Sequence, residues 1–161
     1  MLVRSAQHQA EEAMKIETSE LTGAALDWAV ALALGHEVKV RNWQDITAHL
    51  YPAHDADLIA HHRERKTVRV SARQMPGWGM WPNPSYSTNW AQGGPIIERE
   101  EIGTKRNAPC TKGREWEASP SVTAKGAGGK FGYGPTPLIA AMRCFVASKL
   151  GDEVDVPVEL L

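Results

Sequence analysis

The chain has little of three features that assign many proteins to a class. Cys110 and Cys144 are the only cysteines among 161 residues, so a reduced protein is expected rather than a disulfide framework. Lys and Arg number 18 against 19 Asp and Glu, and the formal charge of -1 gives no overall positive field for a phosphate backbone. No apolar run reaches the roughly 18 residues of a membrane span, and residues 1–13 lack the apolar segment of a signal peptide. We therefore expect a cytoplasmic protein without a membrane segment.

Motifs that identify common enzymes and metal sites are also missing from the sequence. It contains no HExxH or CxxC pattern, and no serine stands in a GxSxG sequence. Asp57 and His61 have a spacing that would place them on one helix face, but no further pattern supports a metal site there. The run Glu98–Glu101 has no second acidic cluster beside it and is typical of a solvated face. The sequence therefore predicts no catalytic residue, no cofactor and no metal.

The clearest positive signal is a helix near the C-terminal end of the sequence. Thr136 is a suitable N-cap, and Pro137 at the first helical position lacks a donor that the helix does not use. Gly151 is suited to the left-handed conformation that ends a helix. These residues predict a helix over residues 137–150. Its core-facing residues recur at three- and four-residue steps and are Leu138, Ala141, Met142, Phe145, Val146 and Leu150.

A second amphipathic helix is predicted over residues 20–34. Ser19 would be its N-cap and Gly35 its end, and Trp28 lies on the apolar stripe between them. Gly23 falls inside this helix, where it costs about 1 kcal/mol relative to alanine, and we attribute it to close packing against a neighbouring backbone.

Short alternating segments predict the strands of a small antiparallel sheet. Strands are expected at residues 14–18, 36–43, 67–72 and 116–119, with residues 154–158 as an edge strand or extended arm. A short helix is expected at residues 53–63, and residues 96–101 are expected to form a short helix started by Pro95, with a strand as the alternative. Loops are expected at residues 76–95, 104–112 and 121–134. Because strands and helices do not alternate regularly, the fold class is α+β, with one small antiparallel sheet packed against two main helices.

Residues 76–95, PGWGMWPNPSYSTNWAQGGP, contain four prolines, four glycines and three tryptophans. Their aromatic side chains either pin a long loop to the core or form a groove for a partner, and the sequence leaves both open. The candidate ligand-binding residues of this loop are Trp78, Trp81, Tyr86, Ser87, Thr88, Asn89, Trp90 and Gln92.

A second candidate surface is the glycine-rich segment at residues 125–134, which precedes a helix start as phosphate-binding loops do. Ala124 and Phe131 stand where a P-loop requires Gly and Ser or Thr, so a flexible loop that leads into a capped helix is the competing interpretation. The candidate anion-binding residues are Lys130, Thr136, Arg99 and Arg143. For the two arginines, structural pairing with an acid such as Asp27 is the first expectation.

Three blocks of the sequence resemble one phage family. They are MKIETSELTGAALDWAVA at residues 14–31, YSTNWAQGGPIIERE at 86–100 and GPTPLIAAMRCFVASKLGDEVDVP at 134–157. Together they resemble the NinX family of lambdoid bacteriophages, a domain of unknown function. The resemblance implies a phage or prophage accessory protein in the cytoplasm of an infected or lysogenic bacterium, and it implies no reaction.

The same resemblance suggests how the chain is organised. Residues 1–13 lie before the usual start of the family, so they are interpreted as an N-terminal extension of a single domain at residues 14–161. Residues 36–80 look like an insert relative to the usual spacing. The insert contains His49, His54, His61 and His62.

We interpret the chain as a non-enzymatic binding domain that uses the surface between Trp78 and Glu100 and the helix start at Thr136. Its partner would be a protein or a small ligand, and self-association is also open because the Trp-rich surface is large for one small core. The alternative is a phosphate- or nucleotide-binding protein, with or without catalysis. Binding of single-stranded nucleic acid through the tryptophans is the third interpretation.

Overall fold

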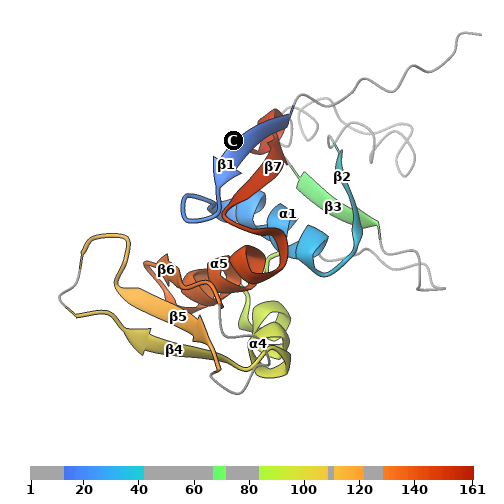
Figure 1. The fold of residues 1–161 in the computed structure, drawn as a ribbon. Coiled ribbons are helices and arrows are strands. Elements are labelled where there is room, and N and C mark those ends of the chain that lie inside the picture. Colours follow the sequence, from blue (N-terminus) through green and yellow to red (C-terminus); the bar gives the residue numbers. More distant parts are fainter. Residues whose placement is uncertain (1–12, 42–66, 72–83, 109–110, 122–128) are drawn as a thin grey trace, which may run out of the picture.

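The computed structural model describes residues 13–41, 67–71, 84–108, 111–121 and 129–161 (Figure 1). Several sequence-based predictions lie outside these ranges. They are the extension at residues 1–12, most of the insert at 36–80 with its helix at 53–63, the four histidines of the insert, and Trp78 and Trp81.

The described elements follow one another as helices and short strands. They are β1 (Ala13–Glu17), α1 (Gly23–Ala33), β2 (Glu37–Arg41), β3 (Thr67–Ser71), α4 (Trp90–Arg99), β4 (Ile102–Arg106), β5 (Trp116–Pro120), β6 (Gly132–Gly134), α5 (Pro137–Leu150), β7 (Glu153–Pro157) and a 3-10 helix at Val158–Leu160. The strands expected near residues 14–18, 36–43, 67–72, 116–119 and 154–158 are confirmed. Among the described helices, none has the length and apolar character needed to cross a membrane.

All the described strands pair antiparallel, and they form three sheets. β1 pairs with β7, β2 pairs with β3, and β5 lies between β4 and β6. The α+β fold class is thus confirmed, although the strands are divided among three small sheets and not joined in one. Figure 1 shows the β1–β7 pair on one side of α5 and the β4–β5–β6 sheet on the other.

The helix α5 lies at the centre of the molecule, between these sheets and beside α1 and α4 (Figure 1). Its predicted bounds and start are confirmed, since Thr136 Oγ1 accepts a hydrogen bond from the N–H of Ile139 at 3.2 Å. Residues 138 and 140–147 are buried. The helix is therefore packed on all sides along this part, whereas the sequence predicted that only one face would be buried. Leu150, predicted to face the core, lies in the last turn and is 40% exposed.

The helix α1 differs at its start from the prediction. It begins at Gly23 after Thr22, whose side chain makes no capping bond, and Ser19 hydrogen-bonds instead to the Glu17 carboxylate at 3.3 Å. Gly23 has a φ of +51°, and a Cβ there would meet no atom within 4 Å. Glycine is thus needed for the backbone angle that turns the chain into the helix, and the close packing that we expected is absent.

Three predicted loops contain regular structure. α4 begins at Trp90, because the side chain of Asn89 caps it, and Pro95 lies inside this helix instead of starting it. β4 includes residues 104–106, which were predicted as loop. Ile102 is its buried residue and the other four are exposed, so the alternation that identifies a strand is missing. β6 is formed by Gly132, Tyr133 and Gly134, at the end of the predicted glycine-rich connection.

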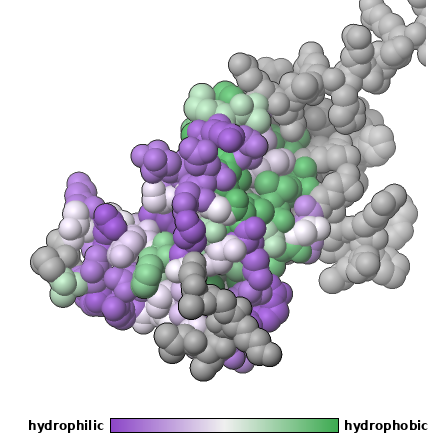
Figure 2. Space-filling view, viewed as in Figure 1, coloured by the Kyte–Doolittle hydropathy of each residue, from purple (hydrophilic) through white to green (hydrophobic). Residues whose placement is uncertain are grey.

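One core joins the two main helices, as expected. It includes Leu26, Trp28 and Val30 of α1 and Met142 and Phe145 of α5. Its other buried members come from the same two helices, from α4, β4, β5 and β7, from Leu21 before α1 and from Leu160 of the 3-10 helix. Figure 2 shows hydrophilic side chains over the β4–β5 hairpin and apolar ones around α1. The apolar residues at the end of α1 (Leu32, Ala33 and Leu34) are only partly buried.

Candidate functional site

The segment at residues 84–89 leads into α4 and is held on α1 by a buried carboxylate. Asp27 of α1 is 6% exposed, and its Oδ1 accepts a hydrogen bond from the backbone N–H of Ser87 at 2.8 Å. Ser87 is itself buried, and its hydroxyl has no hydrogen-bond partner within the described structure. The described part of the Trp/Pro/Gly loop (residues 84–95 of 76–95) therefore lies over the α1–α5 core, where a backbone hydrogen bond fixes it.

Among the described residues no arginine pairs with Asp27; of the two arginines expected to pair with an acid, Arg99 does so with Glu100, whereas Arg143 bonds backbone carbonyls. Burial raises the pKa of the Asp27 carboxyl group, and the hydrogen bonds from Ser87 and from the Tyr86 backbone lower it by less. Burial also raises the pKa of the Tyr86 hydroxyl, and the nearby charge of Asp27 raises it further. The loop is thus anchored by a carboxylate whose ionisation is opposed by its surroundings.

The polar side chains proposed to orient a ligand are largely used within the segment itself. Asn89 Oδ1 accepts from the N–H of Ala91 at 2.9 Å, and Gln92 Oε1 accepts from the N–H of Ser85 at 2.8 Å. Trp90, by contrast, is 55% exposed at the first turn of α4, beside the exposed Thr88. The structure thus presents one indole on a segment that is fixed by hydrogen bonds on both sides of it.

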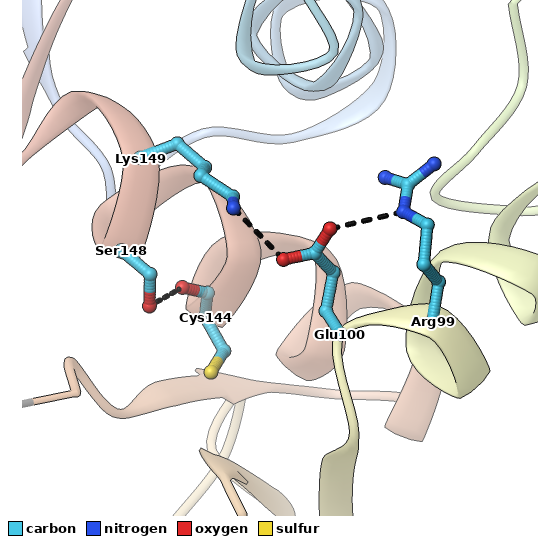
Figure 3. A network of polar contacts seen from close by, with 5 residues as sticks. All are labelled: Arg99, Glu100, Cys144, Ser148 and Lys149. Carbon is cyan, nitrogen blue, oxygen red and sulfur yellow. Dashed lines mark hydrogen bonds and ion pairs between the residues drawn. The ribbon is translucent and has the colours of Figure 1, made fainter. Parts of the chain in front are cut away.

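Each of the residues proposed to bind an anion has a partner within the described structure. Lys130 pairs with Asp152, the Thr136 hydroxyl caps α5, and Arg99 Nε lies 3.0 Å from a Glu100 carboxylate oxygen. Figure 3 shows Glu100 between Arg99 and Lys149, whose Nζ lies 2.9 Å from the second carboxylate oxygen. The contact with Lys149 has the largest effect on the pKa of Glu100, and both contacts lower it. The contact with Lys149 also ties the end of α4 to the last turn of α5.

Cys144 lies on α5 five residues before Lys149 and is fully buried (Figure 3). The Ser148 hydroxyl donates to the Cys144 carbonyl at 2.8 Å, and the thiol donates to the Lys130 carbonyl at 3.2 Å. Burial raises the pKa of the thiol to about 11. Because the thiolate is the reactive form, this cysteine has the character of a core residue and not of a nucleophile.

Arg143 has a different environment from that predicted. It is 7% exposed and donates from Nε to the Leu21 carbonyl at 3.0 Å and from Nη1 to the Tyr133 carbonyl at 2.6 Å. Burial lowers its pKa. Arg143 lines a cavity of about 570 Å³ between β1, the turn after β1, β6, α5 and β7. Sequence reasoning named Arg143 and missed the rest of this lining, because it comes from four separate stretches of the chain.

Asp27 gives the first testable prediction. In the Asp27→Asn variant the side-chain oxygen still accepts from Ser87, but the cost of ionisation is removed. Because the pKa is raised in the folded state, the wild-type carboxyl favours folding at low pH and loses this contribution as pH rises from the ordinary Asp value of about 3.9 through its folded value. The stability of wild type relative to the variant should therefore fall with increasing pH across that window.

Urea unfolding of both proteins at a series of pH values from about 4 to 7 measures this difference. Glu100 titrates in the opposite sense, since its pKa is lowered, but it is present in both proteins and cancels in the comparison. A difference in unfolding free energy that stays constant over this range would show that Asp27 ionises without cost.

Comparison with known protein families gives one match. The family model described as "Bacteriophage P22, NinX" matches residues 17–149, from the end of β1 to the last turn of α5. Asp27, Ser87, Trp90 and Arg143 all lie inside the matched region. No curated protein matches the chain.

Proposed function

Because the chain belongs to the bacteriophage P22 NinX family and is thus a phage accessory protein, we propose that it is a non-enzymatic binding domain. In this proposal Trp90, presented at the start of α4, enters an apolar pocket of a protein partner. The site of action is the cytoplasm of an infected or lysogenic bacterial cell.

The observation that carries this proposal is the combination of an exposed indole with a fixed backbone. Trp90 is 55% exposed, and the chain before it is held by Asp27, by the Asn89 cap and by the bond between Gln92 and Ser85. Tryptophan is enriched among the residues that dominate binding energy. A side chain that is already positioned loses less conformational freedom on binding, which favours affinity.

The titratable groups Asp27 and Glu100 make structural contacts, which favours a binding function over a catalytic one. The Asp27 carboxylate is beneath the segment and bonded to its backbone, and the Glu100 carboxylate is held by two cations. Asp27 therefore holds the chain just before Trp90, and Glu100 holds the end of the helix that begins with Trp90.

The second prediction tests this proposal with the Trp90→Ala variant. Proteins captured from a host lysate by immobilised wild type are identified, and the affinity of each purified protein for wild type and variant is measured. We expect the variant to fold normally, because its changed side chain is exposed, and to bind its partner at least about 30-fold more weakly, as for loss of an interface hot spot. Light scattering on both proteins shows whether the partner is a second copy.

Leu161→Ala is the matched control, because Leu161 is also 55% exposed and apolar but is the last described residue and not part of α4. It should bind like wild type. The proposal is wrong if Trp90→Ala keeps every interaction that the wild type makes. If single-stranded oligonucleotide quenches tryptophan fluorescence and salt weakens the effect, the partner is nucleic acid and not protein.

A further inference from the structure

Arg143 carries a buried positive charge that no acidic side chain neutralises within the described part of the chain. Its bonding partners there are two backbone carbonyls, those of Leu21 and Tyr133. A guanidinium group has five N–H donors, and these two bonds use its Nε and one of its Nη nitrogens. Burial of a charge without a counter-ion is costly, which is consistent with the lowered pKa of this side chain.

The side chain of Arg143 lines a cavity that is large enough for a small molecule. Ligand sites typically measure about 300–1,000 Å³, and this cavity measures about 570 Å³. Thr18 and Ser19 border it on the β1 side, and Phe131 and Tyr133 border it on the β6 side. Neither Trp90 nor any other residue of α4 is among its lining residues.

The charges around the cavity limit what it can hold. Lys15 is paired with Glu153 at 3.7 Å, and Lys130, next to the lining residue Phe131, is paired with Asp152. Two cationic and three acidic side chains line the cavity altogether, so Arg143 is the cation that has no acidic partner there. A phosphate with two or more charges would be repelled by the acids, whereas a single carboxylate would match Arg143 alone.

The apolar part of the lining indicates what else the ligand has. Phe131 is 59% exposed and Leu150 is 40% exposed, and both border the cavity together with Ala147. Exposed large apolar side chains at the mouth of a cavity favour a ligand with an apolar body.

From these observations we propose that the cavity beside Arg143 binds a small organic monocarboxylate with an aromatic or aliphatic body. Its carboxylate accepts hydrogen bonds from Arg143, and its apolar body lies against Phe131 and Leu150. This site is separate from the Trp90 surface, and its occupation does not depend on the proposed protein partner.

The test is a titration of the full-length protein with benzoate, followed by two-dimensional amide NMR. Benzamide, which has the same shape and no charge, and inorganic phosphate are titrated in parallel. We expect benzoate to shift amide signals of residues 18–19, 131–133 and 143–147, and benzamide and phosphate to leave them in place. Equal effects of benzoate and benzamide, no effect of benzoate, or stronger binding of phosphate would each overturn the proposal.

Variants then assign the two parts of the site. Arg143→Gln keeps donors for the buried carbonyls and should weaken benzoate binding by about tenfold or more, the factor for loss of a charge-assisted hydrogen bond. Because Arg143→Gln also removes a core contact, Phe131→Ala supplies an independent test at an exposed position, with several-fold weaker binding expected. Arg106→Gln removes an exposed charge on β4, away from the cavity lining, and should bind benzoate like wild type. Unchanged affinity in folded Arg143→Gln, or in Phe131→Ala, would contradict the assignment.

Discussion

Replacing Gly132 with alanine is expected to destabilise the protein by about 2–3 kcal/mol, a large effect for the addition of one methyl group. A Cβ at this position would lie 2.1 Å from the Ala140 carbonyl oxygen and 2.4 Å from the Cys144 nitrogen. Both atoms belong to the backbone of α5, so no side-chain rotation can make room for the methyl group. β6 would have to move away from the central helix, and the β4–β5–β6 sheet with it.

Urea or thermal unfolding measures this loss, and Gly103→Ala in β4 is the control. At Gly103 the nearest atom to a new Cβ is the Ser119 carbonyl oxygen at 3.8 Å, which is an ordinary contact. We expect the control to stay within about 0.5–1 kcal/mol of wild type. Equal unfolding midpoints for the two variants would mean that β6 does not approach α5 as closely as described.

Two neighbouring glycines of α4 are expected to respond to the same substitution with opposite sign. Gly93→Ala should destabilise by about 1–3 kcal/mol, because its Cβ would lie 2.4 Å from the Tyr86 carbonyl oxygen and 2.6 Å from Leu138 Cδ1. The leucine can shift, but Tyr86 precedes the residue whose N–H is bound by Asp27, so its carbonyl has little freedom. The clash therefore strains the attachment of the Trp90 segment to the core.

Gly94→Ala should instead stabilise the protein by up to about 1 kcal/mol. Its nearest neighbour would be Trp90 Cε3 at 3.8 Å, so alanine adds helix propensity without a clash. Urea unfolding of the two variants gives the comparison, with circular dichroism to show that α4 is retained. If both variants were destabilised by the same amount, the effect would belong to the helix in general and not to the contact with Tyr86.

Elements with local signals could be predicted from the sequence, and elements held by distant partners could not. α5 has its cap, its proline and its terminal glycine within the helix or next to it, and its bounds were predicted correctly. β6 contains two glycines among its three residues, a composition that disfavours strands. It is a strand because β5 pairs with it and because only glycine allows its backbone to lie so close to α5.

The candidate site shows the same limit. The composition of the loop drew attention to the segment that carries Trp90. It also suggested Ser87, Asn89 and Gln92 as groups for a ligand, and these side chains or their backbones are engaged within the protein. The partner of Asp27 is 60 residues away, and Arg143 bonds a carbonyl 122 residues away. No spacing rule relates positions so far apart.

The central place of α5 has a consequence for how the protein matures on the ribosome. α1, β4, β5 and β6 all pack against a helix that is synthesised after them, and β1 pairs with a strand that is synthesised later still. A nascent chain that ends before residue 137 thus contains α1, β4, β5 and β6 but lacks α5, the helix against which they pack. Cooperative folding therefore has to wait until α5 and β7 have been synthesised, and until then the apolar faces of the earlier segments are open to chaperones and proteases.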